Sequence, residues 1–371
     1  MRNLKIALMA MATAAVLFVP ANAETTLKDA YKDAFAIGAA MNAAEITGRD
    51  TKSDAIVLSQ FSSISPENDL KWERVHPTPE RYDFAVPDQY VAFGQKHGLY
   101  TVGHVLVWHS QTPKWVFENK DGAPISKDDL LARLKEHIFT VAGRYKGKIK
   151  AWDVINEVVG DDGKMRQSPW YKIGGEELFV KAFQWAHEAD PAAELTYNDY
   201  NIEYPNKRAE ALALVKRLKA AGAPITTVGI QAHYTLAEPD LKFLDEAITE
   251  FAKLGVKVAL TELDIDVLPR PGAGATADVS LRLAEDPKYN PYVKGLPEEV
   301  QAKLTARYAE VFAIALKHKD VVNRITLWGV TDADTWHNGW PIPNRTAYSL
   351  LFDRAGNPKP AVDAIIKAAK P

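Results

Sequence analysis

The sequence predicts an α/β fold in which a single (β/α)8 TIM barrel forms one domain. Three observations predict this fold. Short apolar segments recur along the chain, amphipathic segments of helical period lie between them, and polar side chains gather where the apolar segments end. A short, nearly continuous apolar segment is typical of a parallel strand that is buried on both faces. Strands that alternate with helices in this way favour a barrel.

Eight apolar segments are expected to be the barrel strands. They lie at residues 35–40, 61–65, 100–108, 149–155, 194–200, 227–234, 256–263 and 324–330. Amphipathic segments between them are expected to be helices, at residues 128–145, 176–189, 207–221, 241–254 and 298–318. Several helices carry boundary signals. Ser126 with Asp129 resembles a capping box, Gly222 and Gly255 follow helix ends, and Pro191 closes another helix.

One compositional break interrupts the alternation, at residues 269–295, where proline and glycine recur. The segment follows the seventh strand, so we expect a long loop on the face of the barrel where the strands end. Loops of this length are often functional. Whether this region binds a metal ion stays open, and its weak candidates are Asp266, Asp278, Glu285 and Asp286.

Residues 1–23 are expected to be a secretory signal peptide. Arg2 and Lys5 form a basic start, residues 6–19 are almost wholly apolar, and residues 21–23 read Ala-Asn-Ala, as at a cleavage site. A membrane anchor is the alternative, but the apolar stretch is short for a bilayer span. Residues 24–371 are therefore expected to form the barrel and to be exported, either to the periplasm or out of the cell.

The composition excludes several kinds of site and partner. The chain has no cysteine, which excludes disulfides and thiolate metal sites. It carries 45 Lys and Arg residues against 48 Asp and Glu residues, a modest acidity that gives no support for a nucleic-acid partner. No second apolar stretch approaches spanning length, so no membrane association is expected once the signal peptide is removed. The oligomeric state stays open.

Two of the strand segments end in a glutamate, Glu157 after the fourth strand and Glu262 in the seventh. Carboxylates at the C-terminal ends of different strands lie where the active sites of α/β barrels are built. Strands four and seven are three steps apart in a ring of eight, so these carboxylates can flank the barrel axis. Such a pair supplies the acid and the nucleophile of glycoside hydrolysis. A solvated charge is the alternative for one glutamate alone, but two in matching context argue against it.

The side chains that surround these glutamates suit a sugar. Amides, imidazoles and indoles follow several strands, and they provide hydrogen-bond partners for hydroxyls and aromatic faces for pyranose rings. Asn156 is placed to reach the sugar 2-hydroxyl, and His233 with Asp264 is placed to keep Glu262 ionised. Metal binding is a weaker interpretation of the histidines, because no His-Glu-x-x-His or comparable spacing is present. No cofactor is expected.

Six segments resemble those of glycoside hydrolase family 10, the retaining endo-β-1,4-xylanases. They lie at residues 66–73, 103–111, 152–157, 231–233, 259–264 and 328–331. They occur in order on the expected strands, and the match runs from about residue 35 to residue 360. The resemblance implies an endo-acting hydrolase of the β-1,4-xylosidic linkages of xylan and xylo-oligosaccharides. It also implies a two-step double displacement through a covalent glycosyl-enzyme intermediate, with retention of anomeric configuration.

The resemblance further implies roles for individual residues. Glu157 is the expected acid/base and Glu262 the expected nucleophile, with His233 and Asp264 as support for the nucleophile. The sugar next to the scissile bond is expected to be lined by Lys71, His104, Trp108, Asn156, Gln231, His233, Trp328 and Trp336. The flanking sugars are expected to contact Glu67 and Asn68 beyond this position, and Asn198 and Tyr200 on the leaving-group side. Gln111 and Trp336 are expected to crowd the hydroxymethyl group of glucose, which favours xylose.

Several other residues have a structural interpretation. Trp72 and Trp152 fit the core as well as the site, and Asp153 fits a buried hydrogen-bond acceptor. The histidines of the helical segments are expected to be ordinary surface residues, namely His97, His137 and His187.

Two alternative functions compete with this interpretation. Another retaining barrel glycosidase, such as a cellulase or a mannanase, would keep both glutamates but would not be expected to reproduce segments 67–72 and 104–111 together. A non-catalytic carbohydrate-binding barrel belongs to a different class. It has no need of either carboxylate, so the presence of both argues against it.

Overall fold

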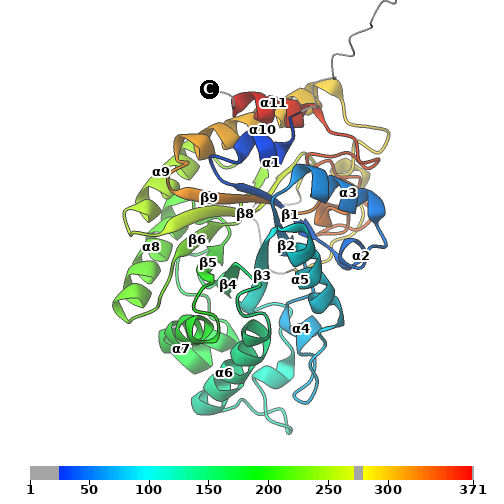
Figure 1. Ribbon diagram of the computed structural model, residues 1–371. Helices are drawn as coiled ribbons and strands as arrows, with labels where there is room; N and C mark the ends of the chain where they lie inside the picture. Colours follow the sequence, from blue (N-terminus) through cyan, green and yellow to red (C-terminus); the bar gives the residue numbers. More distant parts are fainter. Residues whose placement is uncertain (1–24, 271–278, 370–371) are drawn as a thin grey trace, which may run out of the picture.

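The structure is a computed structural model that describes residues 25–270 and 279–369. The expected signal peptide at residues 1–23 and residues 271–278 of the expected loop lie outside the described residues. Figure 1 shows strands in the middle of the molecule with helices around them, which is the layering of an α/β barrel. The predicted (β/α)8 TIM barrel is therefore confirmed.

The described strands form one parallel sheet in the order β6-β5-β4-β3-β2-β1-β9-β8-β7, and pairing between β6 and β8 closes the barrel. The strands are β1 Ala36–Met41, β2 Ser63–Pro66, β3 Tyr100–Val107, β4 Ala151–Asn156, β5 Glu194–Asp199, β6 Thr227–Ile230, β7 His233–Thr235, β8 Lys257–Asp266 and β9 Val322–Leu327. Most of their residues are buried, as expected for strands covered on both faces.

The segment predicted as one sixth strand, residues 227–234, is divided into two. β6 pairs with β8 in the barrel, whereas β7 continues separately beside the C-terminal half of β8. Ala232 causes the break, because its φ of 66° lies in the left-handed region and cannot continue a strand. The short β7 places His233 opposite Asp264.

Helices cover the outside of the barrel, and most of them alternate with the strands (Figure 1). The α-helices are α1 Leu27–Tyr31, α2 Ala43–Ile46, α3 Thr51–Gln60, α4 Trp72–Val75, α5 Ala85–His97, α6 Lys127–Arg144, α7 Pro169–Ala189, α8 Pro205–Ala220, α9 Leu241–Ala252, α10 Glu298–Lys317 and α11 Pro360–Ala368. Single 3-10 turns are η1 Lys114–Val116, η2 Pro287–Tyr289 and η3 Trp336–Asn338.

The five predicted helices correspond to α6, α7, α8, α9 and α10. Ser126 caps α6 by accepting a hydrogen bond from the Asp129 backbone N–H. The predicted start of α7 at residue 176 is late, because α7 begins at Pro169 and kinks at Gly175, whose φ is 66°. The kink interrupts the helical period, so the sequence pattern is visible only after it.

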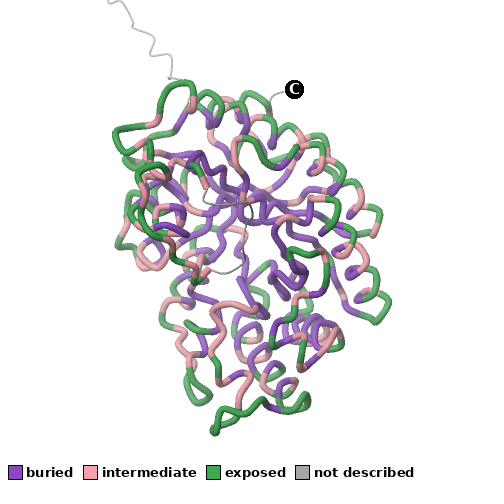
Figure 2. The backbone as a smooth tube through the Cα atoms, turned by 180° about the vertical axis from the view of Figure 1, so that it is seen from behind, coloured by how far each residue is buried: buried purple, intermediate pink, exposed green. Residues whose placement is uncertain are grey.

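Buried residues concentrate on the strands and on the inner faces of the helices, as Figure 2 shows. Trp72 and Trp152 both belong to this core. Trp152 passes so close to Gly103 that a Cβ there would lie 2.2 Å from the indole ring. Glycine at residue 103 therefore lets the neighbouring strands β3 and β4 carry this large side chain.

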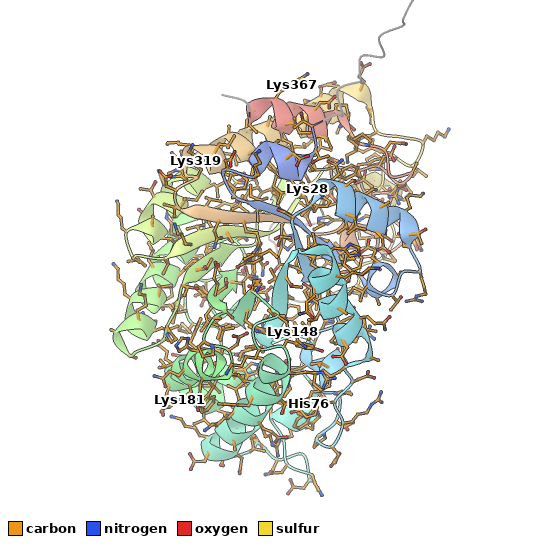
Figure 3. All side chains as sticks on the ribbon, viewed as in Figure 1. Lys28, His76, Lys148, Lys181, Lys319 and Lys367 are labelled. Carbon is orange, nitrogen blue, oxygen red and sulfur yellow. The ribbon has the colours of Figure 1, made fainter. Side chains whose placement is uncertain are left out.

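The prediction that His137 lies on the surface is wrong. It is fully buried and stacks on Trp72 with ring centroids 3.5 Å apart. It shares the inner face of α6 with Leu134 and Ile138, so helical spacing turns it inward. Its Nδ1 atom lies 3.2 Å from Nδ1 of His76, which Figure 3 labels. His97 and His187 are exposed as predicted.

The described parts of the predicted loop, residues 269–270 and 279–295, contain no α-helix or β-strand, and their one regular turn is η2. Residues 279–295 pack on the segment that follows β9. Asn290 exchanges hydrogen bonds with the backbone of Asn344 and Thr346, and Tyr348 donates to the Tyr292 carbonyl. Within residues 25–270 and 279–369, no helix is both long enough and apolar enough to cross a membrane.

Candidate active site

A cleft of about 640 Å³ lies at the C-terminal ends of the strands. The structure brings most of the predicted site residues together in its walls. The predicted residues that line it are Glu67, Asn68, Lys71, His104, Trp108, Gln111, Asn156, Glu157, Tyr200, Gln231, His233, Glu262, Trp328 and Trp336. Two predicted residues do not line the cleft, Asn198 and Asp264, and both are fully buried behind it.

Glu157 directly follows β4 and is buried. Its backbone has a φ of 57°, and its N–H donates to the Asn198 carbonyl at 2.9 Å. Trp108 Nε1 donates to Oε2 at 2.8 Å and Gln231 Nε2 donates to Oε1 at 3.0 Å. Burial raises the pKa of Glu157 and the charge of Glu262 raises it further, while these two hydrogen bonds act in the opposite direction. The net effect favours a protonated carboxyl group.

Arg166 supports this arrangement from behind, and the sequence analysis did not identify it. Its Nε donates to the Glu157 carbonyl at 2.7 Å, and its Nη2 donates to the Tyr200 hydroxyl at 2.9 Å. The Tyr200 hydroxyl in turn contacts Asp161. Arg166 lies in the segment between β4 and α7, where no pattern in the sequence distinguishes it from a surface arginine.

Glu262 lies in β8 and is also buried, yet its surroundings favour the ionised form. Asn198 Nδ2 donates to its Oε1 at 2.8 Å, and His233 Nε2 lies 3.2 Å from its Oε2. Burial alone would raise the pKa of Glu262. The hydrogen bond from His233 and the positive charges of His104, His233 and Lys71 outweigh burial, so the pKa falls below its usual value.

His233 is held between Glu262 and Asp264. Its Nδ1 lies 3.0 Å from Asp264 Oδ2, which also accepts a hydrogen bond from Trp336 Nε1 at 2.7 Å. His337 Nε2 lies 3.1 Å from the other oxygen of Asp264. Burial opposes a charge on His233, but Asp264 and Glu262 raise its pKa to about 10. The positive charges of His337 and His233 overcome the burial of Asp264 and hold its pKa well below the usual range.

Asn198 lies beneath the two glutamates, and the predicted contact with the leaving-group sugar does not fit this position. The Asn198 side-chain amide donates a hydrogen bond to Glu262. Together with the side-chain amides of Asn156 and Gln231, it forms a buried hydrogen-bonded cluster. A Cβ at Gly229 on the neighbouring β6 would lie 2.4 Å from Asn198 Oδ1. The absence of a side chain at residue 229 thus leaves room for Asn198 to turn toward Glu262.

One wall of the cleft carries polar groups in an ordered arrangement. Lys71 Nζ donates to Asn68 Oδ1 at 2.9 Å and to Gln111 Oε1 at 3.0 Å, and it lies 4.8 Å from the centre of the Trp108 ring. His104 Nδ1 lies 2.9 Å from Asp153, so Asp153 is the buried acceptor that was predicted. These contacts set the orientation of each side chain before any ligand binds.

The cleft is also lined by residues that are not among the predicted site residues. Arg270, Val279, Ser280, Arg282, Gly339 and Trp340 line the cleft from the segments that follow β8 and β9. Trp340 stacks on Trp336 with ring centroids 4.7 Å apart. Both arginines lie in the region recognised as a loop, but its composition does not indicate which side chains face the cleft.

Among the described residues, one group of carboxylates could hold a cation, namely Glu45, Asp50 and Asp334, whose oxygens lie within 4.8 Å of one another. None of the loop residues weighed as metal ligands belongs to this group, and Asp278 lies outside the described residues.

Comparisons with known proteins agree with this geometry. A family model described as glycosyl hydrolase family 10 matches residues 26–368. The chain is 43% identical over 344 residues to endo-1,4-beta-xylanase A of Xylanibacter ruminicola, covering 93% of each chain. It is 45% identical over 344 residues to a beta-1,4-xylanase of Dictyoglomus thermophilum, covering 92% of this chain and 90% of the other.

Solved structures match equally well. The structure of an endoxylanase from a sugarcane soil metagenome is 47% identical with a TM-score of 0.89, and the match covers 92% of this chain and 99% of that chain. A mutant structure in complex with xylotriose is 36% identical with a TM-score of 0.82, covering 92% and 99%.

Proposed function

Because the chain belongs to glycosyl hydrolase family 10, we propose that it is an endo-β-1,4-xylanase that cleaves xylan with retention, through a covalent glycosyl-enzyme intermediate. The observation that carries the mechanism is the opposite shift of two buried carboxyl groups. The pKa of Glu157 is raised and that of Glu262 is lowered within one cleft. Neighbouring carboxyl groups with diverging pKa values are suited to act as acid and as nucleophile.

In the first step, the ionised Glu262 attacks C1 of the sugar while Glu157 donates its proton to the glycosidic oxygen. The bond between C1 and that oxygen breaks, and an ester forms between C1 and Glu262. In the second step, Glu157 accepts a proton from water, the water oxygen attacks C1, and Glu262 leaves as a carboxylate. Asn156, which lines the cleft beside Glu157, is proposed to bond the 2-hydroxyl in both transition states.

The rest of the cleft is proposed to select and hold xylose units. Glu67, Asn68 and Lys71 bind the sugar ring hydroxyls on one side of the scissile bond. Gln111 and Trp336 leave too little room for a hydroxymethyl group, which argues against a cellulase or a mannanase. Tyr200 lies on the leaving-group side. The apolar and basic start of the chain supports export, where a polymer too large to enter the cell is accessible.

Two measurements test this proposal. Reducing-sugar release from xylan, cellulose and mannan, compared side by side, separates a xylanase from other glycosidases and from a barrel that only binds sugar. The anomer formed first, followed by proton NMR on a xylo-oligosaccharide, tests the mechanism. The β-anomer is expected from retention. An initial α-anomer would show inversion, and Glu262 would then activate water instead of attacking C1.

A further inference from the structure

Two guanidinium groups line the cleft, from the segment that follows β8. Arg270 and Arg282 both line the cleft that contains Glu157 and Glu262. Arg282 is exposed, and the Arg270 side chain retains 31% of its accessible surface. Their donors are therefore within reach of a ligand that lies along the cleft.

Arg282 forms no salt bridge within 4.0 Å to a carboxylate of residues 25–270 or 279–369. Its Nη1 donates to the backbone carbonyls of Val279 at 2.9 Å and Leu281 at 2.8 Å. These bonds to neutral oxygens orient the side chain without cancelling its charge. Lys288 lies in the same segment but outside the cleft, and its ammonium group does form a salt bridge, with Asp286 at 2.9 Å.

Arg270 shares its carboxylate partner, Asp266, with a neighbouring histidine. Arg270 Nε lies 3.2 Å from Asp266 Oδ2, and His337 Nδ1 lies 3.7 Å from the same oxygen. Burial lowers the pKa of the neighbouring Arg345, and repulsion by Arg270 adds to this effect while Asp266 opposes it. Asp264 also faces His337, at 3.1 Å from its Nε2. Arg270 is therefore paired with Asp266 and can only assist Arg282.

Glu67, Lys71 and the exposed Glu73 also line the cleft. Lys71 is buried and donates hydrogen bonds to Asn68 and Gln111, whereas Arg282 is exposed. An anionic substituent that projects from a bound polymer would therefore meet Arg282 more readily than Lys71. Trp340 lines the cleft on the same side as Arg282 and offers an aromatic ring to an adjacent pyranose.

We propose that Arg282, assisted by Arg270, binds the carboxylate of a uronic acid substituent on the xylan backbone. A guanidinium presents a planar pair of donors that matches the two oxygens of a carboxylate, and charge-assisted bonds of this kind are stronger than neutral ones. This inference rests on the proposed xylanase function and adds a preference for acidic, decorated xylan.

The test compares two polymers that differ only in charge. One is glucuronoxylan, and the other is the same preparation after reduction of its uronic acid carboxyl groups to alcohols. We expect the parent protein to have a higher kcat/KM on the acidic polymer. In Arg282→Gln the ratio of the two kcat/KM values should fall by about threefold to tenfold, because a charge-assisted contact at a partly exposed site is lost. Arg282→Lys should retain only part of the ratio, because lysine keeps the charge but lacks the planar pair of donors.

Lys288→Gln is the matched control, because it removes the same charge from the same segment outside the cleft. It should leave the ratio unchanged. Added salt should lower the ratio of the parent protein, since screening weakens the attraction. An unchanged ratio in Arg282→Gln would overturn the proposal, whether kcat/KM stays the same on both polymers or falls equally on both. Failure of the parent protein to hydrolyse the reduced, neutral polymer would instead contradict the xylanase function itself, so the two failures are distinguishable.

Discussion

His233 Nε2 lies 3.2 Å from Glu262 Oε2, and the two residues come from neighbouring parallel strands. The register pairs His233 with Asp264, and side chains two residues apart on a strand share one face. The imidazole therefore meets both Glu262 and Asp264 from one position. Burial of any one of these three charged groups alone would be unfavourable, but the His233 imidazolium and the carboxylates of Glu262 and Asp264 stabilise one another's charges.

His233→Ala should lower kcat and leave KM nearly unchanged, because it removes the hydrogen bond that lowers the pKa of Glu262. The acidic limb of the pH–rate profile should move to higher pH, by about one pH unit for each 1.36 kcal/mol of lost interaction. Asp264→Asn should have a smaller effect, since the imidazole remains. His97→Ala, at an exposed position on α5, serves as control. A large rise in KM at constant kcat would make His233 a substrate-binding residue.

Glu262→Ala should be inactive on every substrate, since no intermediate can form without the nucleophile. Glu157→Ala should keep activity on aryl xylosides whose leaving groups need little protonation, and lose it on poor leaving groups. The measurement is the rate of aglycone release across a series of substituted phenyl xylosides. The same dependence on leaving group in both variants would show that the roles are assigned wrongly.

Gly229→Ala should damage catalysis without contacting the substrate. The new methyl group would lie 2.4 Å from Asn198 Oδ1 and 2.8 Å from Thr261 Cγ2, so Asn198 must move away from Glu262. We expect a fall in kcat of about tenfold or more and a loss of about 1–3 kcal/mol in the free energy of unfolding. Gly143→Ala, where a Cβ meets no atom within 4 Å, is the control. Parental kcat in Gly229→Ala would show that Asn198 does not orient the nucleophile.

Glu45→Gln should stabilise the protein at alkaline pH and have little effect in acid. Burial, reinforced by the nearby charges of Asp334, Glu67 and Asp50, raises the pKa of Glu45 from 4.5 to about 9. The folded state therefore binds more protons than the unfolded state between these values, and its stability falls as pH rises through that window. A neutral glutamine removes this loss and can still accept the hydrogen bond from the Asn42 N–H.

The measurement for Glu45→Gln is the free energy of unfolding of parent and variant at pH values near 4.5 and 8.5. The difference in free energy of unfolding, variant minus parent, should rise by at least about 1 kcal/mol from the lower to the higher pH, since one pKa unit corresponds to 1.36 kcal/mol. The exposed Glu80→Gln is the control and should gain nothing. A stability difference that does not change with pH would contradict the raised pKa.

The features predicted correctly from the sequence depend on local pattern. Parallel strands buried on both faces are apolar throughout, and their ends meet on one rim, so the sequence predicts that Glu157 and Glu262 lie together without knowledge of any contact.

The split of the sixth strand is not predictable from the sequence, because a left-handed φ of 66° at Ala232 leaves no trace in residue type. The buried position of Asn198 is hidden from the sequence for a related reason. A polar residue at a strand end either faces the cleft or bonds beneath it, and only the packing beside Gly229 decides.

Residues that reach the site from irregular segments were missed for a different reason. Arg166, Arg282 and His337 lie outside the strands, so no periodicity relates them to the barrel axis. His137 shows that residue type alone is a poor guide on an amphipathic helix, because its spacing from Leu134 and Ile138 places this polar residue on the buried face of α6.

Glu157 has a backbone conformation that a non-glycine residue rarely adopts, with φ of 57°, and a buried carboxyl group whose pKa is raised. A strained φ of this kind costs about 1–3 kcal/mol, and burial of the acid adds to that cost. A glycine at residue 157 would relieve the strained φ and remove the buried acid, but it would also leave Trp108 Nε1 and Gln231 Nε2 without their acceptor. Selection for thermostability without an activity assay would therefore act on the acceptor for these two donors and on the backbone strain, and would place no value on the acidity of the group at residue 157.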